Sequence, residues 1–178
     1  FQSVSPRTAG FNSLDMTALT VPTKFMMVIL MIIGGSPSST AGGIKTTTAA
    51  ILFLTVISVV KGKEDPEVFE RHFSKYLVYR AMAVAFISLC LIIIVAMLLS
   101  ITEDVDFLTI IFETASAFGT VGLTLSYTPN LSPFGKIIIS MTMFAGRVGP
   151  LTIALALARK AINNRGNVKY PEDRIMVG

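Results

Sequence analysis

Charged residues are scarce in this chain: Asp, Glu, Lys and Arg make up 15% of its 178 residues, whereas 52% are hydrophobic. Soluble domains carry roughly a quarter charged residues, so a soluble enzyme core is not expected. The high apolar content also excludes a disordered chain. A single cysteine, Cys90, excludes a disulfide framework and a cysteine-based zinc site. The lone histidine, His72, is interpreted as a solvated side chain.

Residues 1–10 contain no basic stretch followed by an apolar one, so no signal peptide is expected there. The chain also lacks an initiating methionine, and we expect it to be part of a longer polypeptide. A net charge of +4 does not indicate nucleic-acid binding here. The basic residues gather in two short segments beside apolar runs, which is typical of membrane proteins.

Long apolar segments account for most of the sequence. Residues 76–101 are the clearest membrane span, because a span needs about 20 apolar residues. Residues 137–158 form a second predicted span, which contains Arg147. A third apolar region, 25–60, is interrupted by the Gly-, Ser- and Pro-rich run 34–43, which cannot form a regular helix. The interrupting loop is predicted at membrane depth, where irregular backbone must line a cavity or be buried by protein.

A fourth apolar segment, 107–123, is too short to span and is predicted to be re-entrant. Asp104 or Asp106 is expected to cap its helix, and Gly119 and Gly122 to end it. The last turn of this helix carries no charge.

Basic residues predict the orientation, because cytoplasmic loops of membrane proteins are enriched in Lys and Arg. Two basic groups are therefore placed inside, together with the C-terminus, and the acidic connection 102–133 is placed outside. The basic residues are Lys61, Lys63, Arg71, Lys75, Arg80, Arg159, Lys160, Arg165, Lys169 and Arg174.

The chain also repeats itself at one constant offset, which aligns Thr8 with Thr120, Gly10 with Gly122, Lys24 with Lys136, and Gly34 with Gly146. A Thr-x-Gly turn, an outer lysine, an apolar helix and a glycine break therefore recur in the same order. An outer helix, a re-entrant helix, a Thr-x-Gly loop and an inner helix are the layout of a cation-channel pore. Backbone carbonyls there replace the water around the ion, and glycine permits the backbone conformation that aims them inward.

Four stretches resemble the Trk/Ktr/HKT potassium-transporter superfamily, and within it the KtrB-type membrane subunits of bacterial Ktr systems. They are residues 3–11 (SVSPRTAGF), 34–47 (GGSPSSTAGGIKTT), 116–124 (SAFGTVGLT) and 145–150 (AGRVGP). The resemblance implies an all-α membrane protein, built from M1-pore loop-M2 repeats of a potassium-channel-like pore with a broken inner helix. Members hold four repeats in one polypeptide, so this chain is expected to be the C-terminal half.

The resemblance divides the chain into four parts. The end of the third repeat, with its filter strand and broken inner helix, is expected at residues 1–60, and a cytoplasmic connection at 61–75. The fourth repeat is expected at 76–162, followed by a cytoplasmic tail at 163–178.

The resemblance also implies the site residues. The filter strands are expected to be Thr8, Ala9, Gly10 and Phe11, and Thr120, Val121, Gly122 and Leu123. Potassium is expected at Thr8, Ala9, Gly10, Thr120, Val121 and Gly122, and glycine at the filter position accompanies potassium preference in the family. The expected gate comprises Gly34, Gly35, Ser36, Pro37, Ser38, Ser39, Thr40, Gly42, Gly43, Lys45 and Arg147.

Two charges lie at membrane depth, where a charged side chain normally faces a cavity or a partner. We expect Arg147 to contact the gate loop through its carbonyls or through a hydroxyl of Ser38, Ser39 or Thr40. The alternative is a purely structural contact. For Lys45, a functional role in the gate and a structural role have equal weight, because its side chain can also extend toward the cytoplasm.

The sequence therefore predicts the potassium-translocating subunit of a bacterial uptake system in the cell membrane, and not an enzyme. Potassium is the expected ion, transport is expected to depend on sodium, and no organic cofactor is expected in this chain. The implied partners are the N-terminal half of the pore, a second copy in a homodimer, a cytosolic nucleotide-binding KtrA-type ring and the lipid bilayer, with no nucleic acid. The alternatives are a sodium-conducting member of the superfamily, a non-conducting membrane scaffold or binding subunit, and a secondary transporter with broken helices.

Overall fold

The computed structural model describes residues 1–62, 67–68, 71–149 and 152. Within them the chain is helical, apart from one hairpin of two short strands, so the predicted all-α fold class is confirmed. The predicted tail at 163–178, the basic residues beyond position 152 and part of the connection 61–75 lie outside the described residues. The elements are η1 (Met16–Ala18), α1 (Val21–Ile32), α2 (Thr46–Val60), β1 (Glu67–Val68), β2 (Arg71–His72), α3 (Lys75–Thr102), α4 (Phe107–Phe118), η2 (Thr128–Asn130) and α5 (Pro133–Val148).

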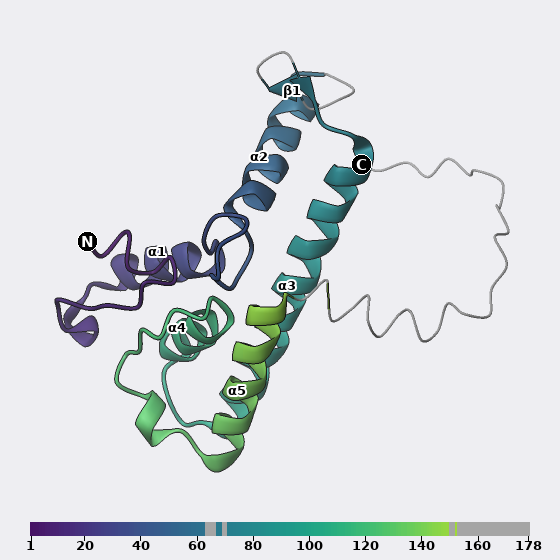
Figure 1. Ribbon diagram of the computed structural model, residues 1–178. Coiled ribbons are helices and arrows are strands. Elements are labelled where there is room, and N and C mark those ends of the chain that lie inside the picture. Colours follow the sequence, from purple (N-terminus) through teal and green to yellow (C-terminus); the bar gives the residue numbers. More distant parts are fainter. Residues whose placement is uncertain (63–66, 69–70, 150–151, 153–178) are drawn as a thin grey trace, which may run out of the picture.

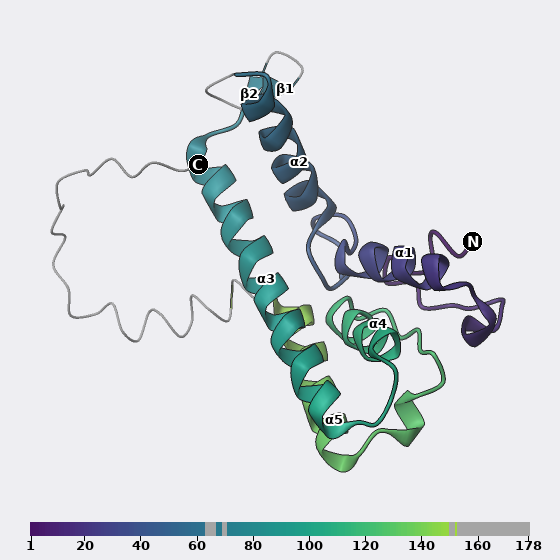
Figure 2. The ribbon, with the colours of Figure 1, turned by 180° about the vertical axis from the view of Figure 1, so that it is seen from behind.

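Helix α3 forms the long axis of the molecule. Its 28 residues extend over about 42 Å, and no charge lies between Arg80 and Glu103. Among the described helices it is the one long and apolar enough to cross a membrane. Helices α2 and α5 pack along different halves of α3, each antiparallel to it (Figure 1; Figure 2). The β1–β2 hairpin joins α2 to α3 at one end of this axis.

The predicted re-entrant helix is α4, and its 12 residues cover only about 18 Å. Asp106 caps it by accepting a hydrogen bond from the Leu108 amide at 3.0 Å, and Gly119 ends it. Between Asp104 and Asp106, the two candidates for the cap, Asp106 therefore occupies the position. Helix α4 is enclosed by α1 on one side and by α3 and α5 on the other (Figure 1). A helix this short cannot cross a bilayer core of about 30 Å, and its re-entrant path stays a prediction.

The internal repeat is visible in the backbone. The offset that aligns Thr8 with Thr120 also carries the first residue of η1 onto that of η2, and the first residue of α1 onto that of α5. One predicted feature is wrong: Gly146 does not break its helix, because α5 continues to Val148 whereas α1 ends at Ile32. Gly146 instead permits close packing, since a Cβ there would overlap the carbonyl of Phe118.

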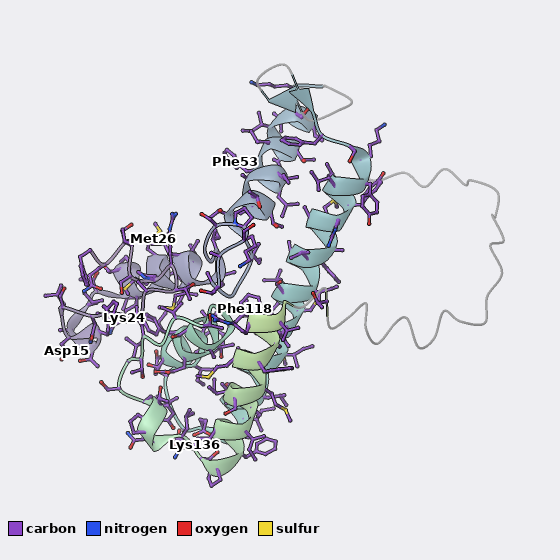
Figure 3. The ribbon with its side chains drawn as sticks, viewed as in Figure 1. Asp15, Lys24, Met26, Phe53, Phe118 and Lys136 are labelled. Atoms are coloured by element: carbon purple, nitrogen blue, oxygen red, sulfur yellow. The ribbon has the colours of Figure 1, made fainter. Side chains whose placement is uncertain are left out.

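Two buried clusters hold α4 in place. The first joins α1 to α4 and to the loop after α4, with Met16, Met27, Val28, Met31, Phe112, Ala115, Val121, Leu123 and Leu125. The second joins α3, α4 and α5, with Val95, Ala96, Leu99, Ile110, Ala117, Leu131, Ile138 and Ile139. Figure 3 shows Phe118, which is fully buried, where the end of α4 meets α5. Large apolar side chains such as Met26 and Phe53 are exposed on the outer sides of α1 and α2, as expected of surfaces that contact lipid or further protein (Figure 3).

Candidate functional site: two Thr-x-Gly loops and the loop between α1 and α2

Two four-residue loops, 8–11 and 120–123, share an unusual backbone. In loop 8–11, Thr8 has a φ of 71° and Gly10 a φ of 74°. In loop 120–123, Thr120 has a φ of 52° and Gly122 a φ of 90°. A threonine in this left-handed region is uncommon, whereas glycine adopts it freely. Alternation between left-handed and ordinary residues turns successive carbonyls toward one side, which is the arrangement that a dehydrated cation needs.

The two loops lie against each other, although they are far apart in the sequence. The hydroxyl of Thr8 donates to the carbonyl of Gly119 at 3.3 Å. A Cβ at Gly10 would overlap the carbonyl oxygen of Val121. Gly10 is therefore required by its backbone angle and by the close approach of the other loop. Gly122 has open space among the described residues, so its backbone angle alone favours glycine.

The interrupted apolar region forms α1 and α2, with the connecting loop 33–45 between them, as the sequence predicts. The loop closes on itself at its base: the amide of Gly34 donates to Ile44 at 2.9 Å, and the amide of Ile44 donates to Ile32 at 3.0 Å. A Cβ at Gly34 would overlap the carbonyl of Gly42, so this narrow base requires glycine. The tip, residues 36–40, is exposed. The connecting loop therefore has a closed base and an exposed tip.

The connecting loop contacts loop 120–123 and faces loop 8–11 across a cavity. The amide of Gly42 donates to the hydroxyl oxygen of Thr120 at 3.1 Å. A Cβ at Gly42 would lie 2.7 Å from the Thr120 side chain, which explains the glycine. A cavity of about 470 Å³ separates the rest of the connecting loop from loop 8–11, and is lined by Arg7, Thr8, Ala9, Gly35, Ser36, Ser39, Thr40, Ala41 and Thr46. The structure therefore places a polar cavity next to the first Thr-x-Gly loop.

Lys45 and Arg147, the two charges predicted at membrane depth, have different surroundings in the structure. Lys45 is half-buried, and its ammonium donates to the carbonyl of Ala41 at 2.5 Å and to that of Ser39 at 3.3 Å. Lys45 thus fastens the connecting loop to the start of α2. Arg147 is exposed in the last turn of α5 and forms no hydrogen bond or salt bridge with the described residues. Its predicted contact with Ser38, Ser39 or Thr40 is not made in this structure, and its role in the gate stays a prediction.

Sequence reasoning missed two buried carboxylates, although Glu113 interrupts one apolar segment and Glu103 directly follows another. Glu113 is 6% exposed and accepts hydrogen bonds from the chain that follows loop 120–123. Glu103 ties α3 to the start of α5, where Ser132 donates from its hydroxyl at 2.5 Å and from its amide, and Tyr127 donates at 3.2 Å. Burial raises the pKa of Glu103, but these hydrogen bonds outweigh burial and leave the pKa below its usual value. Burial also raises the pKa of Tyr127, and the hydrogen bond to the Glu103 carboxylate raises it further.

This geometry defines a class of protein, namely membrane proteins with paired Thr-x-Gly loops and an interrupted helix. The TrkH family, described as cation transport proteins, matches residues 1–166. The chain belongs to this family.

Characterised relatives are similar over the whole chain. Ktr system potassium uptake protein B of Bacillus subtilis is 43% identical over 178 residues, which are 100% of this chain and 39% of that protein. Potassium/sodium uptake protein NtpJ of Enterococcus hirae is 43% identical over 182 residues, covering 100% of this chain and 40% of that protein. Ktr system potassium uptake protein B of Vibrio alginolyticus is 42% identical over 178 residues, which are 100% of this chain and 38% of that protein. The chain thus spans about two fifths of the length of these relatives.

Proposed function

We propose that this chain supplies two of the four filter strands of a potassium-translocating membrane protein. The observation that carries the proposal is the contact between loops 8–11 and 120–123, each with a left-handed Thr and a left-handed Gly. Carbonyls aimed to one side can replace the hydration shell of a cation. Potassium is assigned to Thr8, Ala9, Gly10, Thr120, Val121 and Gly122, with Phe11 and Leu123 completing the strands. The two remaining strands come from a preceding part of the same polypeptide.

The ion is assigned from the family and from the names of the relatives, which are potassium or potassium/sodium uptake proteins. Glycine at both filter positions favours potassium as the conducted ion, and sodium is assigned as a coupling ion. The sodium-conducting alternative is distinguished by measuring which ion the protein transports.

The connecting loop is proposed to act as the gate of this pore. It lines the cavity beside loop 8–11 and touches loop 120–123 through Gly42 and Thr120. Lys45 holds the loop in this position. Arg147 is assigned to the same gate, because a cation at membrane depth requires a polar partner. Residues of the gate are Gly34, Gly35, Ser36, Pro37, Ser38, Ser39, Thr40, Gly42, Gly43, Lys45 and Arg147.

The proposal includes the arrangement in the cell. The protein is assigned to the cell membrane, with the connection 61–75 and the tail 163–178 in the cytoplasm. Residues 1–60 and 76–162 then belong to the third and fourth pore repeats. The two cytoplasmic segments are the surfaces for a nucleotide-binding regulatory ring, and the complete pore is proposed to form a homodimer.

Replacement of the filter glycines in the full-length protein tests the proposal. Gly10→Asp and Gly122→Asp are each expected to abolish potassium uptake in a potassium-transport-deficient strain, without loss of protein from the membrane. A side chain disturbs the carbonyl ring, and a carboxylate changes its field. Uptake at the normal rate in either variant would show that the filter assignment is wrong.

Gly62 offers a matched control. It has a φ of 68°, and no described atom lies near the position of its Cβ. Gly62→Asp introduces the same backbone strain and charge outside the proposed pore, so uptake is expected to persist even if its regulation through the connection 61–75 changes. If the protein were a non-conducting scaffold, the filter variants and the control variant would instead behave alike.

A further inference from the structure

Glu113 is a buried carboxylate on α4 that neither the proposed ion path nor the proposed gate uses. Its Oε1 accepts hydrogen bonds from the Thr124 hydroxyl at 2.5 Å and from the Leu125 amide at 3.0 Å. Its Oε2 accepts from the Thr128 hydroxyl at 2.6 Å. Three donors therefore converge on one side chain that is 6% exposed. Hydrogen bonds to an ionised acceptor are among the strongest in proteins, and three of them can hold a carboxylate away from water.

The donors all lie immediately after loop 120–123. Thr124 and Leu125 follow Gly122 closely in the chain, and Thr128 begins η2. The Thr128 hydroxyl also lies 3.0 Å from that of Thr124, so the three groups form one cluster around the carboxylate. Glu113 thus ties the helix before the loop to the chain after it. The loop is fixed at both of its ends.

Loop 8–11 has a comparable tether without a charge. The amide nitrogen of Gln2 donates to the hydroxyl of Ser13 at 3.3 Å, and the Ser5 hydroxyl donates to the carbonyl of Phe11. In the alignment that places Gly10 on Gly122, Ser13 corresponds to Leu125. Both loops are therefore tied back at the third residue after their glycine. The amide oxygen of Gln2 is buried and has no hydrogen-bond partner among the described residues.

Within the described part of the chain, no Lys or Arg forms a salt bridge with Glu113. There, its three hydrogen-bond donors stabilise the carboxylate. An ionised carboxylate only accepts, and each donor matches that requirement. A strand pinned in this way resists contraction around a small ion, because movement would break strong hydrogen bonds in a buried place.

We propose that Glu113 is a positioning residue that sets the width of the fourth filter strand and thereby discriminates potassium from the smaller sodium ion. The inference rests on the proposed function of loop 120–123 as a filter strand. Glu113 acts through Thr124, Leu125 and Thr128 and does not touch the ion. The carboxylate provides rigidity where the third repeat uses neutral side chains.

The test replaces Glu113 in the full-length protein and measures uptake of potassium with sodium as competitor. Glu113→Gln keeps the size of the side chain but removes the charge, and places a donor where an acceptor is needed. The preference for potassium over sodium is expected to fall about tenfold, the order of magnitude for strong hydrogen bonds to a charged group. Glu113→Asp keeps the charge and is expected to retain more of the preference than Glu113→Gln. Thr128→Val removes the donor to Oε2 and the contact with the Thr124 hydroxyl, but leaves the charge of Glu113 in place. It is expected to shift the preference in the same direction.

Glu103→Gln is the matched control, because Glu103 is also a buried carboxylate that accepts from hydroxyl and amide groups, but it joins α3 to α5. It is expected to lower thermal stability and to leave the ion preference unchanged. An unchanged ion preference in Glu113→Gln, at normal protein level and melting temperature, would overturn the proposal. An equal loss of preference in Glu103→Gln would also overturn it, since the effect would then be general destabilisation.

Two further results keep the test decisive. If Glu113→Gln does not accumulate in the membrane, Thr128→Val decides, and an unchanged preference in that variant rejects the positioning role. Gly122→Asp separates this inference from the proposed function. Loss of uptake in Gly122→Asp together with unchanged preference in Glu113→Gln and Thr128→Val rejects only the role of Glu113. Normal uptake in Gly122→Asp rejects the filter itself.

Discussion

The backbone amide of Gly42 donates a hydrogen bond to the side-chain oxygen of Thr120, 3.1 Å away and 78 residues further along the chain. This bond connects the loop between α1 and α2 directly to one of the two Thr-x-Gly loops. A change in the arrangement of the connecting loop therefore has to break or move a contact with a residue that we assign to the filter. Through this hydrogen bond, a movement of the proposed gate at Gly42 can change the position of Thr120 in the proposed ion path.

Shortening the connecting loop is expected to raise potassium flux. Deletion of residues 36–40 removes the exposed tip and leaves the hydrogen-bonded base, Gly34 with Ile44, in place. The filter glycines are untouched, so the preference for potassium should be retained. Uptake rates and sodium competition in cells that produce the full-length protein provide the measurement. Flux at or below the unmodified level, with normal protein content, would contradict a gating role for this loop.

Lys45→Met is expected to raise flux in the same direction as the deletion, but less. Methionine keeps an unbranched side chain and cannot donate to the carbonyls of Ser39 and Ala41, so the loop loses one anchor.

Arg147→Ala is expected to raise flux as well, and to make uptake depend less on the cytosolic subunit that forms the proposed regulatory ring. Uptake with and without that subunit is the measurement. If Lys45→Met raises flux and Arg147→Ala does not, Lys45 holds the loop and Arg147 has a structural role.

Cysteine labelling tests the orientation and the re-entrant path. Helix α2 ends at the same end of the molecule at which α3 begins (Figure 1). Gly62 follows the end of α2 and the exposed Asp104 follows the end of α3, so the length of α3 separates the two positions. In a background with Cys90→Ser, we expect Gly62→Cys to react from the cytoplasm, and Asp104→Cys and Asn130→Cys from outside. Labelling of positions 104 and 130 from opposite faces would require α4 to cross the membrane, and the re-entrant assignment would then be wrong.

Glu103 is expected to make stability depend on acidity. Burial raises its pKa, but the hydrogen bonds from Ser132 and Tyr127 outweigh burial, so the folded-state pKa lies below the usual 4.5. The carboxylate therefore stabilises the fold above pH 4.5, and this contribution is lost as the pH falls through the lowered pKa. Melting temperatures of the purified protein between pH 3 and pH 7, a window on either side of roughly 4.5, provide the measurement.

Glu103→Gln should melt at a lower temperature at neutral pH and show a weaker acid dependence. Asp104→Asn is its control, because Asp104 is exposed and is expected to contribute little. The assignment to Glu103 fails if both variants keep the acid dependence of the unmodified protein.

Gly146→Ala is expected to destabilise the protein by about 1–3 kcal/mol, the usual range for an overpacked core. The added methyl group would overlap the carbonyl of Phe118, at the point where α4 leads into loop 120–123. Ser140→Ala, at an exposed position of the same helix, serves as the control. Melting temperature and potassium affinity are the measurements, and both are expected to fall for Gly146→Ala alone. Unchanged stability would mean that α5 can move away from α4 at little cost.

Local features of the fold could be predicted from the sequence. The uncharged run in α3, the short apolar segment that becomes α4 and the Gly- and Pro-rich interruption between α1 and α2 each act within a few residues. Glycine and proline act on their own backbone, and apolar length determines whether a helix can span. The starts of η2 and α5 lie at the same offset from the starts of η1 and α1, because each repeat uses the same local turns.

The contacts between distant residues required the tertiary structure. Gly146 looked like a helix break, yet it lies within α5, because its role is to let α5 approach Phe118. The hydrogen bonds from Lys45 to the carbonyls of Ser39 and Ala41 became known only from the tertiary structure, and the role of Lys45 in the gate stays a prediction. The sequence shows Glu113 as one acidic residue in an apolar segment, and only the return of the chain after Gly122 gives it three donors. Local chemistry determined the elements of this protein; the packing of α1, α4 and α5 decided which loops and charges meet.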